Sequence, residues 1–221
     1  MISVIIPSYN QQEYLPDAIE SALLNHPHEV IVIDDGSTDS SLEVARRYKG
    51  IKIISQVNKG LASARNTGIM NATGDYILPL DADDVLRDDA IEKIEAKILE
   101  TDADIVAPSF KTFGTSSQEI IVGPKPIPSV FDFLEANRIG YFSAIRKSKL
   151  LEIGGYSPKM TWGYEDLHLW INLLNRGAKL VTMEDILVLY RTKEHSMIAT
   201  AQAHHEELMA QIKHDFPELY V

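Results

Sequence analysis

The stretch Leu80-Asp81-Ala82-Asp83-Asp84 decides the fold, because it places three carboxylates within four positions directly after an apolar run. That run, Tyr76-Ile77-Leu78-Pro79-Leu80, predicts a buried strand. Carboxylates gathered at the end of a buried strand repel one another and are costly to desolvate unless a positive charge neutralises them. Mg²⁺ or Mn²⁺ would do so, since both prefer oxygen ligands and keep positions open for substrate phosphates. The alternative is a solvated acidic turn before the next helix, to which Asp88 and Asp89 would belong.

Apolar runs alternate with helical patterns through the first half of the chain. Strands are expected at 3–6, 29–33, 51–54, 76–80 and 104–108, and helices at about 15–26, 40–48, 59–74 and 91–100. Ser40 and Glu43 predict a capping box at the second helix. Pro79 predicts an irregularity in its strand, because proline removes a donor from the sheet. This alternation is typical of a parallel, doubly wound α/β sheet.

Three polar clusters follow three of these strands. They are Ser8-Tyr9-Asn10, Asp34-Asp35-Gly36-Ser37 and Asp81-Ala82-Asp83-Asp84. In a doubly wound sheet, ligands bind beyond the carboxyl ends of the strands. The three clusters are therefore expected on one rim of the sheet, which favours a ligand site over an isolated acidic turn.

The pattern is less regular in the second half. Residues 109–128 lose periodicity and are rich in Ser, Thr, Gly and Pro. Beyond them, helices are expected at 131–137, 149–153, 165–177 and 198–214, and strands at 141–145 and 186–190. With 221 residues and no clear linker, a single domain over residues 1–221 is expected.

The composition excludes several classes of function. The net charge of −11, from 21 Lys and Arg against 32 Asp and Glu, argues against nucleic acid as a partner. The absence of cysteine excludes disulfides and thiolate metal sites. No run approaches the roughly 20 apolar residues of a transmembrane segment, and the first residues lack the basic start of a signal peptide. A cytoplasmic protein is expected. Peripheral membrane contact and the oligomeric state stay open.

Several motifs, taken in this order, resemble those of glycosyltransferase family 2, whose members have the GT-A fold. They are VIIPSYN at 4–10, VIDDGSTD at 32–39, NKG at 58–60, ARNTG at 64–68, DAD at 81–83, GYED at 163–166, and YR at 190–191 leading to HS at 195–196. The resemblance implies a Rossmann-like, mostly parallel sheet flanked by helices, with a smaller mixed-sheet half. Residues 1–108 would bind the nucleotide sugar, and residues 109–221 would bind the acceptor and include a C-terminal helix.

The same resemblance implies an inverting glycosyltransferase that depends on a divalent metal. It would move one sugar from a nucleotide donor, with UDP the expected nucleotide, to a hydroxyl of a carbohydrate or lipid-linked acceptor. Such an activity would serve cell-surface polysaccharide, glycolipid or glycan synthesis. The Gln-x-x-Arg-Trp pattern of processive polysaccharide synthases is missing, which favours addition of a single sugar.

The resemblance also assigns roles to individual residues. The nucleotide-binding set is Pro7, Tyr9, Asn10, Asp34, Asp35, Lys59, Arg65 and Asp81. Mn²⁺ or Mg²⁺ would be held by Asp83 and His195, Asp166 would be the general base with Glu165 beside it, and Trp162 and Tyr164 would contact the acceptor.

Each assignment has a structural alternative. Asp34 and Asp35 could form an Asx turn, and Arg65 could pair with either of them in a purely structural ion pair. Acids at a helix N-terminus, such as Glu165 and Asp166, also complement the helix dipole. A lone histidine such as His195 is often a surface residue.

Two other functions remain to be weighed. A non-catalytic module that binds nucleotide sugars would share the same motifs, although Asp83 and Asp166 argue for catalysis. A nucleotidyltransferase that makes nucleotide sugars has a related α/β layout, but it needs a Gly-rich N-terminal loop with a basic residue. Ser8-Tyr9-Asn10 offers neither.

Overall fold

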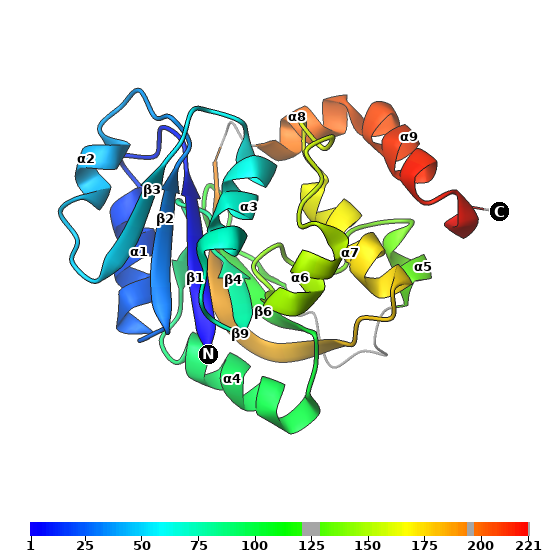
Figure 1. Ribbon diagram of the computed structural model, residues 1–221, viewed down its shortest axis with the longest axis horizontal. Coiled ribbons are helices and arrows are strands. Elements are labelled where there is room, and N and C mark those ends of the chain that lie inside the picture. The colour runs from blue at the N-terminus through cyan, green and yellow to red at the C-terminus, as the bar shows by residue number, and fades with distance from the viewer. Residues whose placement is uncertain (121–128, 194–196, 221) are drawn as a thin grey trace.

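The computed structural model describes residues 1–120, 129–193 and 197–220 (Figure 1). Its strands form one sheet in the order β3-β2-β1-β4-β8-β6-β9-β5, with β7 paired to β6. The first elements are β1 (Ile2–Ser8), α1 (Leu15–Leu24), β2 (Glu29–Asp34), α2 (Ser41–Ala45), β3 (Ile51–Ser55), α3 (Leu61–Asn71), β4 (Tyr76–Pro79), β5 (Val85–Leu86) and α4 (Ala90–Thr101). They are followed by β6 (Ile105–Gly114), β7 (Glu119–Ile120), α5 (Val130–Phe133), β8 (Ala144–Arg146), α6 (Lys147–Ile153), α7 (Glu165–Asn175), β9 (Leu180–Thr192), α8 (Met197–Ala203), α9 (His205–Asp215) and a 3₁₀ turn (Pro217–Leu219).

The four strands β3, β2, β1 and β4 are parallel, as the alternation of patterns predicts. Every residue of β1 is buried, because helices cover both faces of the sheet. Ile5 belongs to the core shared with α3 and α7, whereas Val4 and Ile6 belong to the core shared with α1 and α4. Successive side chains of a strand point to opposite faces, so a fully buried strand reads as a continuous apolar run.

Close packing between α3 and β1 depends on Gly68. A Cβ atom at this position would lie 2.4 Å from Cγ2 of Ile5, which is itself buried. We expect Gly68→Ala to lower the free energy of unfolding by about 1–3 kcal/mol, since overpacking outweighs the gain in helix propensity. Urea denaturation would measure the loss. Met70→Ala, at an exposed position on the same helix, is the control. A Gly68→Ala protein more stable than the wild type would contradict the prediction.

The second half of the sheet is mixed. β8 runs antiparallel to both β4 and β6, whereas β6 and β9 are parallel to each other from Ile105 to Gly114. β9 also pairs antiparallel with the short β5. The long β9 curves beneath the other strands in Figure 1 and brings its last residues to the carboxyl ends of β1 and β4.

Several elements differ from the sequence predictions. β6 and β9 are longer than the predicted strands at 104–108 and 186–190, because backbone pairing continues through their polar residues. The loss of structure predicted from residue 109 is therefore wrong as far as Gly114, and residues 121–128 lie outside the described part. The predicted helix at 198–214 is two helices that meet at His204.

Two local predictions, one at the start of a helix and one at the end of a strand, also fail. Ser40 makes no side-chain cap at α2, where the backbone N–H of Ser41 donates instead to Asp39. Pro79 is the last residue of β4 and pairs with Ile5 without a register shift. A proline at the end of a strand interrupts no further ladder bond, so the expected irregularity does not arise.

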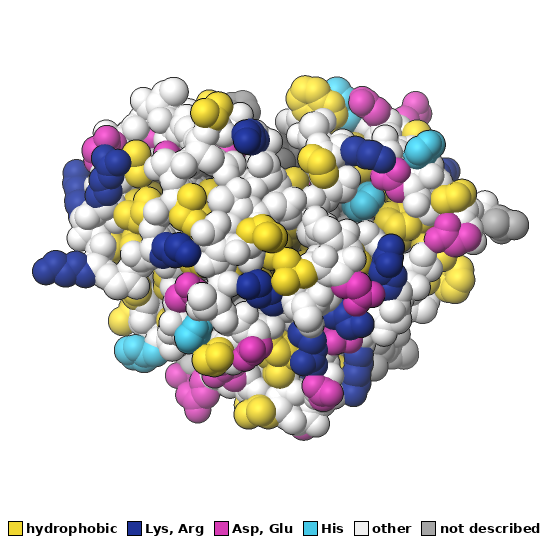
Figure 2. All heavy atoms as spheres, in the orientation of Figure 1, with side chains coloured by type: hydrophobic (Ala, Val, Ile, Leu, Met, Phe, Trp, Pro, Cys, Tyr) yellow, Lys and Arg dark blue, Asp and Glu magenta, His cyan; other side chains and the backbone are white. Residues whose placement is uncertain are grey.

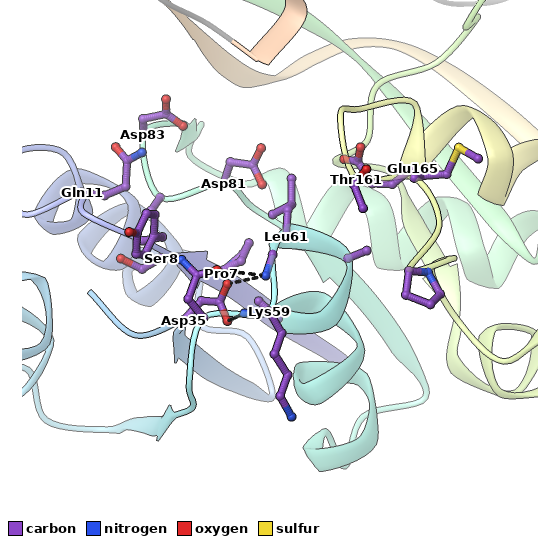
Figure 3. Close-up of a pocket in the computed structure, with 18 of the residues that line it drawn as sticks. Pro7, Ser8, Gln11, Asp35, Lys59, Leu61, Asp81, Asp83, Thr161 and Glu165 are labelled. Atoms are coloured by element: carbon purple, nitrogen blue, oxygen red, sulfur yellow. Dashed lines mark hydrogen bonds between the residues drawn. The ribbon is translucent and has the colours of Figure 1, made fainter. Parts of the chain in front are cut away.

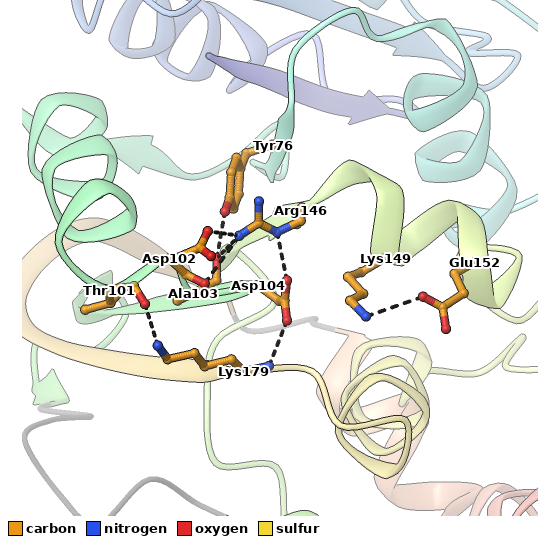
Figure 4. Close-up of polar contacts among 9 residues, drawn as sticks. All are labelled: Tyr76, Thr101, Asp102, Ala103, Asp104, Arg146, Lys149, Glu152 and Lys179. Carbon is orange, nitrogen blue, oxygen red and sulfur yellow. Dashed lines mark hydrogen bonds and ion pairs between the residues drawn. The ribbon is translucent and has the colours of Figure 1, made fainter.

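A polar network joins β8 to the beginnings of β6 and β9 (Figure 4). Arg146 Nε donates to Asp104 at 2.7 Å, its terminal nitrogen donates to Asp102 at 2.6 Å, and its guanidinium lies over the ring of Tyr76. The backbone N–H of Lys179 donates to the other oxygen of Asp104. This network lies at the amino ends of the parallel strands, whereas the three polar clusters lie at their carboxyl ends. None of the described helices is long and apolar enough to cross a membrane.

Candidate active site

A cavity of about 570 Å³ opens where β1, β2 and β4 end and α3 begins (Figure 3). In the space-filling view, the upper edge of the molecule is notched between the part over α3 and the part over α8 (Figure 2). Residues from all three predicted polar clusters line this cavity. Those of the predicted set that line the cavity are Pro7, Tyr9, Asp35, Lys59, Asp81, Asp83 and Glu165.

Asp35 fixes the loop that leads into α3. Its carboxylate is buried and accepts hydrogen bonds from the backbone N–H groups of Lys59 at 3.0 Å and Gly60 at 2.8 Å. The side-chain amide of Gln56 donates to the same carboxylate at 2.7 Å. Gly60 has φ 85°, a conformation that favours glycine. Asp35 therefore shapes the wall of the cavity and also lines it.

Asp34 and Asn10 do not line the cavity. Asp34 accepts from the backbone N–H of Ser37 at 3.2 Å, which is the Asx turn considered as its alternative. Asn10 accepts from the backbone N–H of Thr38 at 2.8 Å and of Asp39 at 3.3 Å. These bonds connect the turn after β1 to the turn after β2, and so hold Tyr9 at the cavity, where it is 46% exposed.

Arg65 joins the two halves of the chain. Its side chain is 1% exposed, and its guanidinium donates to Asp81 at 2.8 Å and to Glu165 at 2.7 Å. The alternative of an ion pair with Asp34 or Asp35 is wrong, because α3 directs this side chain toward the end of β4. The rings of Tyr141 and Tyr156 lie 4.8 and 5.2 Å from the guanidinium carbon. Burial raises the pKa of Asp81, and Arg65 opposes that effect.

The three carboxylates after β4 have three different environments. Asp84 is buried and accepts from the hydroxyl of Tyr141 and from the backbone N–H of Arg191. Burial and its two acidic neighbours hold the pKa of Asp84 well above its usual value. Asp83 faces the cavity, and one of its oxygens lies 2.5 Å from Nζ of Lys193. Of the three, Asp83 is therefore the carboxylate that could hold a cation.

The predicted metal ligands are only partly placed. His195 lies outside the described residues. Within 1–120, 129–193 and 197–220, no group of three or more His, Asp or Glu side chains could hold a metal ion. Arg191 precedes His195 by four residues in the chain. Its guanidinium donates to the backbone oxygen of Asp83 at 2.7 Å and to Asp17 at 2.9 Å. Its role is therefore to tie β9 to the turn after β4.

A second cavity, of about 790 Å³, adjoins the first. The two share Leu61, Asp81, Glu165 and Tyr190 in their walls. Asp166 lines the second cavity and not the first. Its carboxylate accepts from the backbone N–H of Leu167 at 2.8 Å and from the amide of Asn137 at 2.6 Å. Burial, followed by the charge of Glu165, raises the pKa of Asp166 to about 7.

The loop before α7 is held by the C-terminal helices. Trp162 stacks on His204 with ring centroids 4.5 Å apart, and it lines neither cavity. The hydroxyl of Tyr164 lies 3.0 Å from Nδ1 of His205, and Tyr164 lines the second cavity. Tyr164 has φ 60°, a left-handed conformation that is uncommon outside glycine and sets the start of α7. These contacts hold the start of α7 in place, and with it the positions of Glu165 and Asp166.

Some residues of the site were not found from the sequence. Asn137, Tyr141 and Lys193 each contact one of the carboxylates of the site. Asn137 and Tyr141 were placed in a predicted helix and a predicted strand, but α5 ends at Phe133 and β8 begins at Ala144, so both lie in irregular segments. Lys193 follows the end of β9. A single polar side chain in an irregular segment carries no signal of its partner. The hint in the sequence was the type of residue alone: an aromatic side chain shortly before β8 and a cation directly after β9.

Comparison with known proteins identifies the family of this chain. A sequence model of the family described as Glycosyl transferase family 2 matches residues 3–168. TuaG, a glycosyltransferase of Bacillus subtilis named for teichuronic acid biosynthesis, is 29% identical over 89% of this chain and 81% of that protein. Glycosyltransferase GlyA of Streptococcus pneumoniae is 37% identical over 52% of this chain, and the matched part is 17% of that protein.

A solved structure shares the fold. The S. aureus TarS fragment crystallised with UDP-GlcNAc superposes with a TM-score of 0.80 at 19% identity, over 96% of this chain and 65% of that one. The GT-A architecture expected from the motifs is thus confirmed. With the family match across most of its length, the chain belongs to glycosyltransferase family 2.

Proposed function

We propose that this chain is an inverting glycosyltransferase that moves one sugar from a UDP-sugar in the first cavity to a hydroxyl of a saccharide or lipid-linked acceptor in the second. One observation carries the proposal. The two cavities meet at Asp81, Glu165 and Tyr190, and Asp166 faces only the second. A carboxylate on the acceptor side of a donor cavity is the arrangement that inversion needs.

The first cavity suits a nucleoside diphosphate. Tyr9 offers an exposed ring for stacking on a base, and Asp35 adds a carboxylate at the cavity wall. The TarS fragment with the same fold was crystallised with UDP-GlcNAc and with UDP, which supports a UDP-linked donor here. The name of TuaG supports an acceptor in cell-surface polysaccharide synthesis.

The residues present fit a divalent cation beside Asp83. Asp83 lines the first cavity, and its carboxylate is paired with Nζ of Lys193 at 2.5 Å, so a metal ion bound there would take the place of the lysine ammonium. Mg²⁺ is commonly bound by one or two carboxylates, with substrate phosphates and water supplying the remaining ligands. Asp83 would hold Mg²⁺ or Mn²⁺, with His195 as the further proposed ligand. When bound, such an ion stabilises negative charge on the leaving diphosphate.

The chain's own groups supply the remaining chemistry. The acceptor hydroxyl gives its proton to Asp166 as its oxygen forms a bond to the anomeric carbon. The bond from that carbon to the diphosphate oxygen breaks, and UDP leaves with the electron pair. A base with a pKa of about 7 suits this proton transfer at neutral pH. Arg65 keeps Asp81 and Glu165 in place at the junction of the two cavities.

The second cavity has the chemistry of a sugar site. Amide and aromatic side chains line it: Gln118, Asn137, Gln202, Phe110, Phe142 and Tyr164. Amides both donate and accept hydrogen bonds, as sugar hydroxyls do, and aromatic faces pack on the C–H groups of a sugar ring. Specificity for one acceptor would depend on these residues.

Metal-dependent nucleotide binding tests the donor site. In the presence of Mn²⁺, UDP at about 100 times its dissociation constant should stabilise the protein by roughly 2.7 kcal/mol, a rise in Tm of about 5–10 °C. Asp83→Ala should remove the Mn²⁺-dependent part of this rise. Thermal unfolding with UDP, GDP, CDP and dTDP, each with and without Mn²⁺, would measure it.

Asp88→Ala is the matched control, because Asp88 is an exposed carboxylate five residues further along the chain. It should leave the rise in Tm unchanged. A wild-type protein whose Tm does not respond to any of the four nucleotides would overturn the donor assignment. A full response in Asp83→Ala would remove Asp83 from the site.

A further inference from the structure

We infer that Asn137 is a positioning residue of the transfer reaction, whose side-chain amide holds the carboxylate of Asp166 toward the acceptor. Asn137 Nδ2 donates to Asp166 Oδ2 at 2.6 Å, and both side chains line the second cavity. The inference rests on the proposed function, because it adds a residue to the same site. Asn137 stands 29 positions before Asp166 in the chain, in an irregular segment after α5.

The hydrogen bonds of Asp166 leave room for an acceptor hydroxyl. Oδ1 accepts from the backbone N–H of Leu167, a bond within the first turn of α7. In the described part of the chain, Asn137 is the one side chain that donates to Asp166. Each carboxylate oxygen has two acceptor positions, so one on each oxygen remains for substrate. Asn137 therefore selects which of these positions points into the cavity.

Asn137 contributes little to the fold. Its side chain is exposed, and its own contact within the turn is long, since Oδ1 accepts from the backbone N–H of Ile139 at 3.5 Å. Two other contacts hold the turn. Arg138 Nε donates to the backbone oxygen of Asp132 at 3.0 Å, and Ile139 is buried in the core beneath. Substitutions at exposed positions of this kind usually change stability very little. A large effect of Asn137 on turnover would therefore arise at Asp166.

The surroundings of Asp166 determine the direction of the effect. The ionisable groups that face it or share its cavity are Glu165, Arg65, Asp81, Tyr141, Tyr156, Tyr164, Tyr190, Glu135, Arg138 and His205. Burial and Glu165 raise the pKa of Asp166, while Arg65, Leu167 and Asn137 lower it. A hydrogen bond donated to a carboxylate stabilises the ionised form. Removal of the Asn137 amide should therefore raise the pKa of Asp166 further.

Asn137→Ala tests the inference without knowledge of the acceptor. The pKa of Asp166 can be followed by NMR with ¹³C-labelled aspartate, and Asp166→Asn identifies its resonance. We expect Asn137→Ala to raise this pKa by about one unit. Asn175→Ala is the matched control, because Asn175 donates to Glu218 at 2.7 Å through the same kind of exposed bond near the far end of α7. It should leave Asp166 unchanged.

Turnover gives a second, independent readout. Hydrolysis of UDP-GlcNAc, with water as the acceptor, is measured as UDP release between pH 5 and pH 9. The acid limb of the profile should move up with the pKa in Asn137→Ala, which is a loss of about fivefold at pH 7 that is mostly regained at pH 9. A residue that only supported the fold would lower the rate equally at every pH.

The outcomes separate the inference from the proposed function. If Asp166→Asn abolishes UDP release but Asn137→Ala moves neither the pKa nor the acid limb, the role of Asn137 is wrong and the proposed base stands. If Asp166→Asn leaves UDP release unchanged, Asp166 is not the base, and the role of Asn137 falls with it.

Discussion

Replacing Asp166 with Asn should lower the rate of sugar transfer by about 10²–10⁴-fold, the usual contribution of a general base, while UDP binding is retained. Asp166 lines the acceptor-side cavity and not the donor cavity, so the donor contacts do not include it. Asn keeps the size of the side chain and can still accept from the backbone N–H of Leu167. UDP release and the UDP-dependent rise in Tm, measured on the same preparation, would separate catalysis from binding.

The same substitution has a predictable effect on stability. The pKa of Asp166 is raised to about 7 in the folded chain, against 3.8 for an aspartate in water. Between these two pH values the folded state binds more protons than the unfolded state, so this carboxyl makes stability fall as pH rises. Asp166→Asn should therefore be more stable than the wild type at pH 8 and equal to it near pH 3.5. A lower Tm than the wild type at pH 8 would argue against this burial.

Glu165→Gln tests which of the two adjacent acids, Glu165 or Asp166, acts as the general base. Glu165 is held by Arg65 at 2.7 Å, so it is not free to take a proton from an acceptor. Its replacement should weaken the junction between the two cavities and lower stability. If Glu165→Gln abolished transfer with full stability while Asp166→Asn kept transfer within about tenfold of the wild type, the roles of the two acids would be reversed.

The sequence was sufficient for most of the fold of residues 1–108. β1, β2 and β4 are buried on both faces, so each reads as an apolar run, and α1 carries a clear apolar face. β9 was underestimated for a physical reason. Its central residues Glu184 and Asp185 are exposed and lie at a register shift in the pairing with β6. The pairing on either side of them depends on backbone bonds, which side-chain patterns do not report.

The site was predicted by type of residue but not by pairing. Asp81 and Asp83 could be located because three carboxylates after an apolar run need compensation. What compensates them comes from far away in the sequence: Arg65 on α3, Tyr141 before β8 and Lys193 after β9. These contacts depend on the order of the strands in the sheet. No local sequence pattern predicts that order, in which β8 lies next to β4.

Replacement of Arg65 should have the largest effect on stability of any single change in the site. Its guanidinium is fully buried and bridges Asp81 and Glu165, and the rings of Tyr141 and Tyr156 pack against it. Arg65→Ala leaves two largely buried carboxylates without their shared cation. Breaking a buried pair in this way costs about 3–5 kcal/mol, which corresponds to a fall in Tm of roughly 10 °C for a chain of this size.

Arg146→Ala is a demanding control, because Arg146 also bridges two carboxylates, Asp102 and Asp104, at 2.6 and 2.7 Å. Its side chain is 29% exposed and that of Asp102 is 90% exposed, so water can replace much of the lost interaction. The loss there should be about 1 kcal/mol or less. Urea denaturation would compare the two, with Arg65→Lys as a third variant that keeps the charge but cannot reach both partners through one planar group.

The comparison distinguishes burial from the mere number of ion pairs. If Arg65→Ala were no more destabilised than Arg146→Ala, the cation between the cavities would not be needed for folding. Asp81 and Glu165 would then be neutral or solvated in the folded chain. If Arg65→Lys lay between the wild type and Arg65→Ala, the charge and the geometry of the guanidinium would each contribute. Arg65 alone would then join the end of β4 to the start of α7, because no other described cation lies within ion-pair distance of Asp81 or Glu165.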